Sequence, residues 1–199
     1  MSKIIGEPDG ATPLDPDEME GLKYSHIQTR GQLDELEQIN VQSGMKWLKN
    51  QKKKNPDIFT EGFVCDLHKK LFGDVWKWAG SFRKTGKNIG CDANQIAVQL
   101  RLLLDDARYW VENDTYPPKE LAARFHHRLV AIHPFPNGNG RHSRIMADAV
   151  LTIALGEDPI DWAGGHDLQS MSRQRTKYIA ALRAADAGNY KPLLKLVDA

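Results

Sequence analysis

One stretch of the sequence, Ala131 to Met146, reads AIHPFPNGNGRHSRIM and gathers residues whose types and spacing could do chemistry. Gly138 and Gly140 permit backbone conformations that other residues resist, and they come directly before a predicted helix N-terminus. Main-chain N–H groups at such a terminus attract anions, and phosphate is the natural candidate. Arg141 and Arg144, three residues apart on one face of that helix, could hold phosphate oxygens in bidentate fashion.

Two further titratable residues flank this anion site. His133 comes just before the loop, and its imidazole readily exchanges a proton near neutral pH. Asp148 comes four residues after Arg144 and is expected to orient that guanidinium. Together these groups suggest the attack of a hydroxyl on a nucleotide phosphate. The stretch lacks the Gly-x-x-x-x-Gly-Lys-Ser/Thr pattern of a Walker A loop, and the plain alternative is a polar turn between two helices.

The elements that must position this stretch are predicted to be helices. Apolar residues recur with helical spacing in residues 29–50, 60–73, 92–113, 117–133, 143–156 and 167–188, and a short helix is expected from Tyr190. Thr29 and Gln32 form a predicted capping box, and Gly73 a predicted C-terminal cap. Residues 143–156 are apolar nearly all round, which predicts the central buried helix.

One segment departs from the helical pattern. Residues 76–90, WKWAGSFRKTGKNIG, have short extended pieces around Thr85 and Gly86, which predict a small β-hairpin. The fold class expected is therefore all-α with one small β-hairpin. Residues 1–29 are rich in proline, glycine and acidic side chains, and we expect an N-terminal arm there, followed by a single domain over residues 30–199.

Composition excludes several functional classes. The 27 basic and 26 acidic residues give a formal net charge of +1, which offers no electrostatic footprint for nucleic acid or for an acidic membrane. No apolar run approaches the roughly 20 residues that span a bilayer, and the first residues lack the apolar core of a signal peptide. Cys65 and Cys91 fit neither a disulfide framework nor a metal-ligand spacing. We expect a cytoplasmic protein.

Four histidines lie close together in the sequence, which raises the alternative of a zinc site. They are His126, His127, His133 and His142. The histidine pair spaced i, i+4 with an intervening glutamate is missing, and no cysteine joins them, so a metal hydrolase is not favoured. His126 and His127 are expected to be ordinary helix residues, and His142 a partly exposed residue of a first turn.

The run HPFPNGNGR followed by HSR resembles the motif of the Fic family, His-Pro-Phe-x-Asp/Glu-Gly-Asn-Gly-Arg-x-x-Arg. Two more stretches carry the resemblance. FVCDLHKKLFGDVWKWAGSFR looks like the segment that leads into the family's target-docking flap, and ELAARFHHRLVAIHPF looks like the helix that feeds the motif. Over most of residues 15–197 the chain is similar to the Fic subgroup called mobile mystery protein B.

The resemblance implies a largely helical fold with a β-hairpin flap, and transfer of AMP from ATP to a Ser, Thr or Tyr hydroxyl of a target protein. By position it makes His133 the base that takes the hydroxyl proton, and Phe135 a buried anchor of the loop. The nucleotide-binding residues it implies are Gly138 and Gly140 as a backbone cradle, Asn139 on the phosphates, Arg141 on the β- and γ-phosphates, and Arg144 on the γ-phosphate.

One position departs from the family pattern. Asn137 stands where the family has an acidic residue that binds Mg²⁺, and its neutral amide oxygen is a weaker ligand than a carboxylate. Related Doc-type proteins, which transfer phosphate, use an acidic or amide residue there but lack the Gly138–Gly140 pattern. AMP transfer is therefore ranked first. The alternatives on the same site are a phosphotransferase, an AMP-removing hydrolase, or a nucleotide-binding regulatory module with little turnover.

The resemblance also assigns roles outside the motif. The flap that would register an extended target segment through its main chain comprises Ser81, Phe82, Arg83, Lys84, Thr85, Gly86, Lys87, Asn88, Ile89 and Gly90; the alternative is a purely structural ribbon. Glu20-Gly21 ends a pattern, Ser/Thr-x-x-x-Glu-Gly/Asn, whose glutamate inhibits many Fic proteins by pairing with the second motif arginine. Pro16 stands at its Ser/Thr position, and an arm that is merely solvated is the alternative. A toxin-like protein with an antitoxin-like partner is a further expectation.

Overall fold

Helices form the regular structure of the described residues, which are 16–27, 29–162 and 173–197 in the computed structural model. Their bounds are α1 Pro16–Met19, α2 Arg30–Lys52, α3 Glu61–Phe72, η1 Ala93–Gln95, α4 Ile96–Glu112, α5 Pro118–Ile132, α6 Asn139–Ala149, η2 Val150–Leu155, α7 Arg173–Asp186 and α8 Lys191–Val197. Here η1 is a 3₁₀ turn and η2 a π-helical continuation of α6. The all-α prediction is confirmed. The predictions for residues 1–15 and 163–172 lie outside the described residues.

Helix starts follow the expected side-chain chemistry. The capping box at the start of α2 is confirmed: Gln32 N donates to Thr29 Oγ1 at 3.3 Å, and Thr29 N donates to Gln32 Oε1 at 3.2 Å. Thr60 caps α3 by accepting from Phe63 N at 3.1 Å. α5 begins with proline at its first position, where a missing N–H costs nothing. These caps satisfy donors that a helix start leaves without partners.

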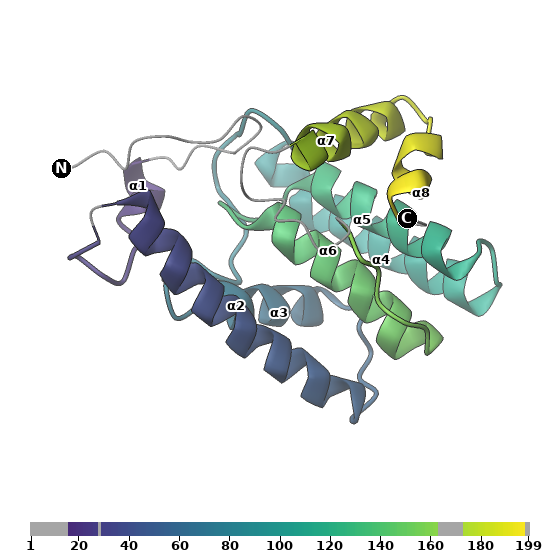
Figure 1. The fold of residues 1–199 in the computed structure, drawn as a ribbon, viewed down its shortest axis with the longest axis horizontal. Coiled ribbons are helices and arrows are strands. Elements are labelled where there is room, and N and C mark those ends of the chain that lie inside the picture. The colour runs from purple at the N-terminus through teal and green to yellow at the C-terminus, as the bar shows by residue number, and fades with distance from the viewer. Residues whose placement is uncertain (1–15, 28, 163–172, 198–199) are drawn as a thin grey trace.

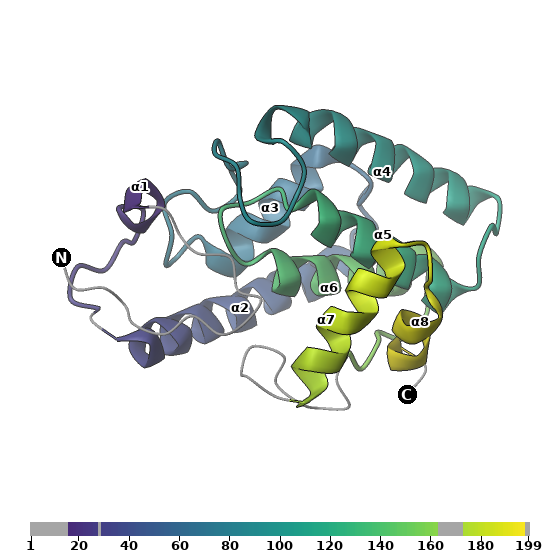
Figure 2. The ribbon, with the colours of Figure 1, turned by 90° about the horizontal axis from the view of Figure 1, so that it is seen from above.

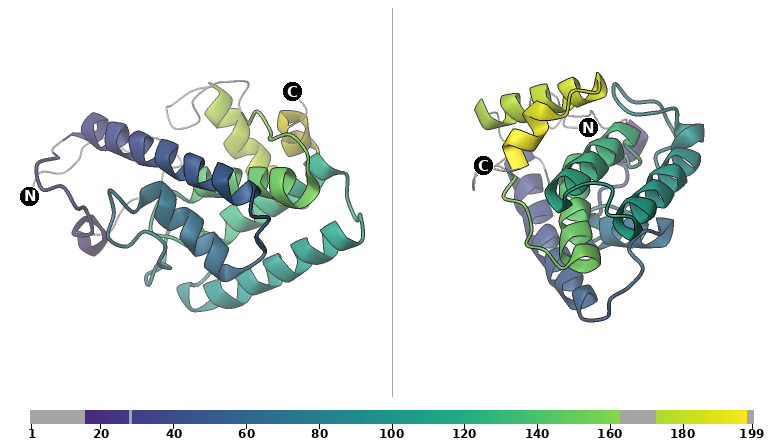
Figure 3. Two further views of the ribbon diagram at one scale, coloured as in Figure 1. Left: turned by 90° about the horizontal axis from the view of Figure 1, so that it is seen from below. Right: turned by 90° about the vertical axis from the view of Figure 1, so that its right-hand side faces the viewer.

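α6 runs through the middle of the molecule, as predicted for residues 143–156, and α5 packs along it (Figures 1 and 2). The α2–α3 pair contacts α6 through α3, whereas α4 packs on α5. The α7–α8 pair lies on the opposite side of the molecule from α2 and α3 (Figure 3). The loop between α5 and α6 is thus surrounded by elements from distant parts of the chain.

The predicted apolar stripes form the core. Their buried members are Phe63, Val64, Leu67 and Leu71 on α3, Ile96, Leu100, Leu103 and Ala107 on α4, and Leu121, Phe125, Leu129 and Ile132 on α5. Because the stripes of α3 and α5 both face α6, the end of α5 and the start of α6 are held side by side. This packing fixes where the turn chemistry of residues 133–138 must lie.

The predicted β-hairpin is wrong within the described residues: Ser81–Gly90 forms an irregular loop with no strand. The physical reason is Arg83, a buried side chain that bonds the loop's main chain in place of a partner strand. Its guanidinium donates to Thr85 O at 2.8 Å and to Cys91 O, carbonyls that a hairpin would pair across strands. We keep the name flap for residues 81–90 without implying β-structure.

Several histidines are buried, and only some of their positions agree with the sequence prediction. His126 and His127 lie on α5 as expected, but His142 was expected to be partly exposed and is wholly buried. It points from α6 onto α3, where its Nε2 lies 3.0 Å from Val64 O and donates to that carbonyl. Burial lowers the pKa of four imidazoles: well below the usual value for His68 and His126, to about 4 for His133 and to about 3 for His142.

These shifts predict that the protein is destabilised by acid in a defined window. Below pH 6.5 the unfolded chain protonates these histidines while the folded chain does not, so the stability present above pH 6.5 is lost as pH falls toward about 4. Each histidine contributes up to about 1.4 kcal/mol per pH unit. Asp148, whose pKa burial raises to about 6, opposes the trend with a single group. Urea unfolding should show a loss of about 3 kcal/mol or more between pH 7 and pH 5.

Two variants check the origin of this pH dependence. His142→Asn should reduce the slope of the unfolding free energy against pH by the contribution of one histidine. The substitution His26→Asn, at an exposed position, should leave that slope unchanged. An unfolding free energy that stays level from pH 7 to pH 5 would contradict the assignment of neutral buried imidazoles.

Candidate active site

The loop between α5 and α6 begins at His133, which ends α5 in the left-handed conformation with φ 54° and ψ 59°. Histidine tolerates this region better than most residues, and the following Pro134 cannot continue the helix. Phe135, predicted to be a buried anchor, is confirmed as fully buried. Its ring stacks on that of His68 with centroids 3.7 Å apart. The turn is therefore fastened to α3 from inside the molecule.

Gly138 is required at the start of α6 for two reasons. Its φ of +77° is unfavourable for residues with a side chain, and an added Cβ would lie 2.7 Å from the ring of Phe72. Gly140 differs, because a Cβ there would have only an ordinary contact of 3.6 Å with Arg144 Nη1. The chain's own packing thus explains Gly138, while nothing in the described chain demands a glycine at position 140.

Asn139 braces the loop through its side-chain amide, and its contact with phosphates stays a prediction. Its side-chain Oδ1 accepts from Phe135 N at 2.9 Å, and its Nδ2 donates to Phe135 O at 2.8 Å. Both ends of the amide are thereby used by the loop's own backbone, and the side chain is buried. The structure therefore shows Asn139 bracing the loop, and its amide keeps a second N–H donor beside the one on Phe135 O.

His133 lies in a buried, positively charged environment that keeps its imidazole neutral. Burial lowers its pKa to about 4, and the charges of Arg83 and Lys87 act in the same direction, while a hydrogen bond to the backbone of Val130 opposes them. At neutral pH the ring therefore has a lone pair available. A neutral imidazole beside a helix N-terminus is the protonation state that a general base needs.

Arg83 ties the flap to the end of α5. Its Nε donates to His133 O at 2.7 Å and its Nη2 to Ile132 O at 3.4 Å, while its main-chain N donates to Pro134 O at 2.9 Å. Carbonyls at a helix C-terminus lack intrahelical donors and carry partial negative charge, so a buried guanidinium satisfies both needs. The Arg83 side chain is thus an internal link of the site, and its part in target docking stays a prediction.

Gly90 closes the other end of the flap against His133. Its φ is +104°, and an added Cβ would lie 2.7 Å from His133 Cβ and 2.8 Å from Arg83 Nη2. Only glycine allows the backbone to approach the histidine this closely. Both ends of the flap are thus built around the residue expected to act as the base.

Arg141 is held by a buried carboxylate from a distant helix. Glu37 on α2 is 3% exposed; its Oε2 pairs with Arg141 Nη2, and its Oε1 accepts from Trp76 Nε1 at 2.7 Å. The Arg141 guanidinium also lies 4.8 Å from the centroid of the Phe72 ring. A guanidinium has five N–H donors, so one edge can stay on Glu37 while others bind a phosphate.

Arg144 donates its side-chain hydrogen bond to a tyrosine and not to Asp148. Its Nη1 donates to Tyr178 Oη on α7 at 3.3 Å. Asp148 Oδ1 instead accepts from Ile160 N at 3.1 Å and from Trp162 Nε1 at 3.0 Å. The expected orienting role of Asp148 is thus limited to charge, because its Oδ1 is hydrogen-bonded by the chain that follows α6 while Arg144 acts on the carboxylate electrostatically.

His68 is a site residue that the sequence reading missed. Its Nδ1 accepts from Gly80 N at 3.0 Å, so Nε2 carries the proton and donates to Asn137 O at 3.0 Å. One buried, neutral ring therefore joins α3, the entry to the flap and the loop. A lone histidine on an apolar helix face gives no sequence signal of this role.

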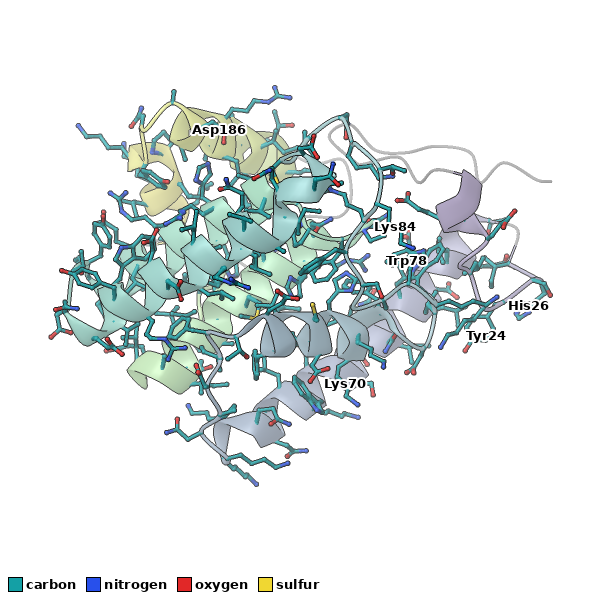
Figure 4. The ribbon with its side chains drawn as sticks, turned by 180° about the vertical axis from the view of Figure 1, so that it is seen from behind. Tyr24, His26, Lys70, Trp78, Lys84 and Asp186 are labelled. Atoms are coloured by element: carbon teal, nitrogen blue, oxygen red, sulfur yellow. The ribbon has the colours of Figure 1, made fainter. Side chains whose placement is uncertain are left out.

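The N-terminal arm contacts the flap through Glu18 rather than through Glu20. Glu18 Oε2 pairs with Lys87, and Glu18 O accepts from Trp78 Nε1 at 2.9 Å. Figure 4 shows Trp78 and the flap's Lys84 on the side of the molecule that carries α1. Glu20 is exposed. An inhibitory role for Glu20 stays a prediction.

The family of this site is identified by comparison. Residues 58–151 match the model of the Fic/DOC family. The chain contains a Fic/DOC family domain. The matched range holds α3, the flap, the loop and α6, whereas Glu37 and Tyr178 lie outside it. Glu37, which pairs with Arg141, lies on α2 before the matched segment. Tyr178, which contacts Arg144, lies on α7 after it.

Curated relatives named Protein adenylyltransferase Fic match the same region. The relative from Aedes aegypti is 26% identical over 170 residues, which are 83% of this chain and 32% of that protein. The relative from Drosophila melanogaster is 30% identical over 138 residues, 67% of this chain and 26% of that protein. The chain thus spans about a third or less of the length of these relatives.

Solved structures share the fold. BepC from Bartonella tribocorum, with AMPPNP bound, has a TM-score of 0.66 at 20% identity, covering 92% of this chain and 97% of that one. Fic-1 from C. elegans has a TM-score of 0.61 at 24% identity, covering 80% and 45%. In the described part of the chain, no helix is both long and apolar enough to cross a membrane.

The Glu37–Arg141 pair yields a prediction for stability. Glu37→Ala would leave the Arg141 guanidinium and the buried Trp76 N–H without their acceptor, and breaking a buried pair costs more than the pair contributes. The free energy of unfolding should fall by about 3 kcal/mol in urea titrations. Glu35→Ala, an exposed residue of the same helix, should change it by less than about 0.5 kcal/mol. Equal effects of the two variants would show that the pair is not structurally important.

Proposed function

We propose that this protein is a protein adenylyltransferase that moves AMP from ATP to a Ser, Thr or Tyr hydroxyl of a target protein. The observation that carries the proposal is a neutral, buried His133 directly before a loop that feeds the N-terminus of α6, with Arg141 and Arg144 in the first turns of that helix. The names of the curated relatives support the same reaction.

The chain's own residues would act at defined points of this reaction. The target hydroxyl oxygen bonds to the α-phosphorus of ATP, the bond to the bridging oxygen breaks, and pyrophosphate leaves. His133, neutral at pH 7, accepts the hydroxyl proton. N–H groups of the first turn of α6 and the guanidinium groups of Arg141 and Arg144 bind the phosphates and stabilise the charge on the leaving group.

Mg²⁺ is proposed as the cofactor, with Asn137 as its protein ligand. The Asn137 side chain is partly exposed, and its Oδ1 accepts from Gly138 N at 2.5 Å, which leaves one lone pair of the oxygen for a cation. Mg²⁺ accepts few protein ligands when phosphates and waters complete its shell, so a single amide oxygen fits the ion. When bound, the ion would neutralise charge on the phosphates.

The remaining expectations are proposals of the same kind. Exposed flap residues such as Lys84, Thr85 and Ile89 would present the main chain to an extended segment of the target. The arm would restrain the enzyme through Glu20, and an antitoxin-like partner could act on the same site. Membership of the mobile mystery protein B subgroup and a cytoplasmic location complete the proposal.

Incubation with ATP labelled on either the α- or the γ-phosphate tests the reaction. Label should reach a protein from α-labelled ATP and not from γ-labelled ATP. His133→Ala should lower the rate roughly 10²- to 10⁴-fold while ATP binding, measured by calorimetry, changes little. The exposed His26→Ala is the control and should transfer at the wild-type rate. Transfer of the γ-label would identify a phosphotransferase instead, and ATP binding without transfer a regulatory module.

Asn137→Asp tests the metal proposal. A carboxylate is the better ligand for Mg²⁺, so the concentration that gives half-maximal AMP transfer should fall. Chelation of Mg²⁺ should abolish transfer in both proteins. The matched control is Asn113→Asp, an exposed position at the C-terminal end of α4, which should leave the requirement unchanged. A requirement that is equal or higher in Asn137→Asp would remove Asn137 from the metal's surroundings.

A further inference from the structure

The Arg144 guanidinium is held by contacts with one side chain, Tyr178. Its Nη1 donates to Tyr178 Oη at 3.3 Å, and its guanidinium carbon lies 5.4 Å from the centroid of the Tyr178 ring. The ring and the hydroxyl of one side chain therefore both contact the guanidinium. Arg144 is partly exposed while Tyr178 is 6% exposed, so the tyrosine supports the arginine from the buried side.

The hydroxyl of Tyr178 is itself fixed by a second residue. It lies 2.9 Å from Nε2 of His126, a fully buried residue of α5. Burial lowers the pKa of this imidazole well below its usual value and raises the pKa of the tyrosine, so both groups are neutral. A hydroxyl that donates to His126 Nε2 and accepts from Arg144 gives a partner to both its proton and a lone pair.

This arrangement decides which group of Tyr178 faces which neighbour. A tyrosine oxygen whose proton points to His126 presents its lone pairs to the guanidinium. Arg144 then keeps its remaining N–H donors for other acceptors. The carboxylate that the sequence suggested for this role, Asp148, is bonded to Ile160 N and Trp162 Nε1.

We propose that Tyr178 is a positioning residue of the nucleotide site, which holds the Arg144 guanidinium where it receives the terminal phosphate of a nucleoside triphosphate. This inference rests on the proposed function, in which Arg144 binds the γ-phosphate. It assigns to α7, which lies outside the matched family segment, a share in distinguishing a triphosphate from a diphosphate. Tyr178 acts through Arg144 and does not touch the reacting atoms.

The test is the affinity for Mg·ATP and Mg·ADP, measured by calorimetry on the full chain. Tyr178→Phe keeps the ring and removes the hydroxyl. It should lower the preference for ATP over ADP roughly three- to tenfold, the effect of one ordinary hydrogen bond, while the affinity for ADP stays level. Tyr109→Phe, on the exposed face of α4, is the control and should leave both affinities unchanged.

An Arg144→Ala background separates positioning from a structural role. If Tyr178 works through Arg144, adding Tyr178→Phe to Arg144→Ala should change the ATP-to-ADP ratio no further. If the role of Tyr178 is only structural, Tyr178→Phe should lower the affinity for ATP and for ADP by the same factor, in the wild-type and in the Arg144→Ala background. That result, or a further change of the ATP-to-ADP affinity ratio in the double variant, overturns the proposal.

The failures of the two proposals are distinguishable. If Arg144→Ala leaves the affinity for ATP unchanged, the proposed nucleotide site itself is wrong, and the role of Tyr178 falls with it. If Arg144→Ala weakens ATP binding but Tyr178→Phe does not, the nucleotide site stands and only the positioning role is overturned. Thermal unfolding of each variant verifies that the measured protein is folded.

Discussion

The guanidinium of Arg83 is the interaction on which the site depends. It binds carbonyls at the end of α5 and carbonyls of the flap, so a single buried cation joins two segments about 50 residues apart in sequence. A buried charge is costly unless it is fully hydrogen-bonded, and here main-chain oxygens at the negative end of a helix supply the compensation. The same contacts fix the carbonyl of His133 and add to the positive field that keeps its ring neutral.

Neutral imidazoles give the site a second common property. His68, His126 and His133 are all buried and all have lowered pKa values, yet each has a separate task. His68 braces the loop, His126 fixes the Tyr178 hydroxyl, and His133 offers a lone pair. A ring with one donor and one acceptor can join two backbone or side-chain groups without adding a net charge to the site.

The sequence predicted the helices and the position of the loop because both depend on local patterns. Apolar spacing located the helices from α2 to α6, and the capping box of Thr29 and Gln32 marked the start of α2. The motif located His133 and the arginines. Sequence reasoning failed where a side chain's partner comes from far along the chain: Asp148 was paired with Arg144 by its spacing, although Ile160 and Trp162 compete for that carboxylate.

The prediction of a β-hairpin in the flap failed for a related reason. Extended residues with turn signals normally indicate paired strands, but a buried arginine can satisfy the same carbonyls and make a ladder unnecessary. Nothing in the pattern around Arg83 distinguishes an arginine that points inward from one that points to a target. Likewise, Glu37 and His68 are a charged and a polar residue on amphipathic helices, and only the packing of α2 on α3 and of α3 on α6 reveals their partners.

The two supports of the loop arginines, Glu37 and Tyr178, stand 141 residues apart, on α2 and α7. During synthesis on the ribosome the catalytic motif is complete well before the second support has been made. The contact between Arg141 and Glu37 can therefore form while the chain is still growing, whereas the contact between Arg144 and Tyr178 can form only after α7 has been made. A nascent chain that ends between Ile145 and Ala149 carries every motif residue, but it still lacks Tyr178, one of the two supports of the loop arginines.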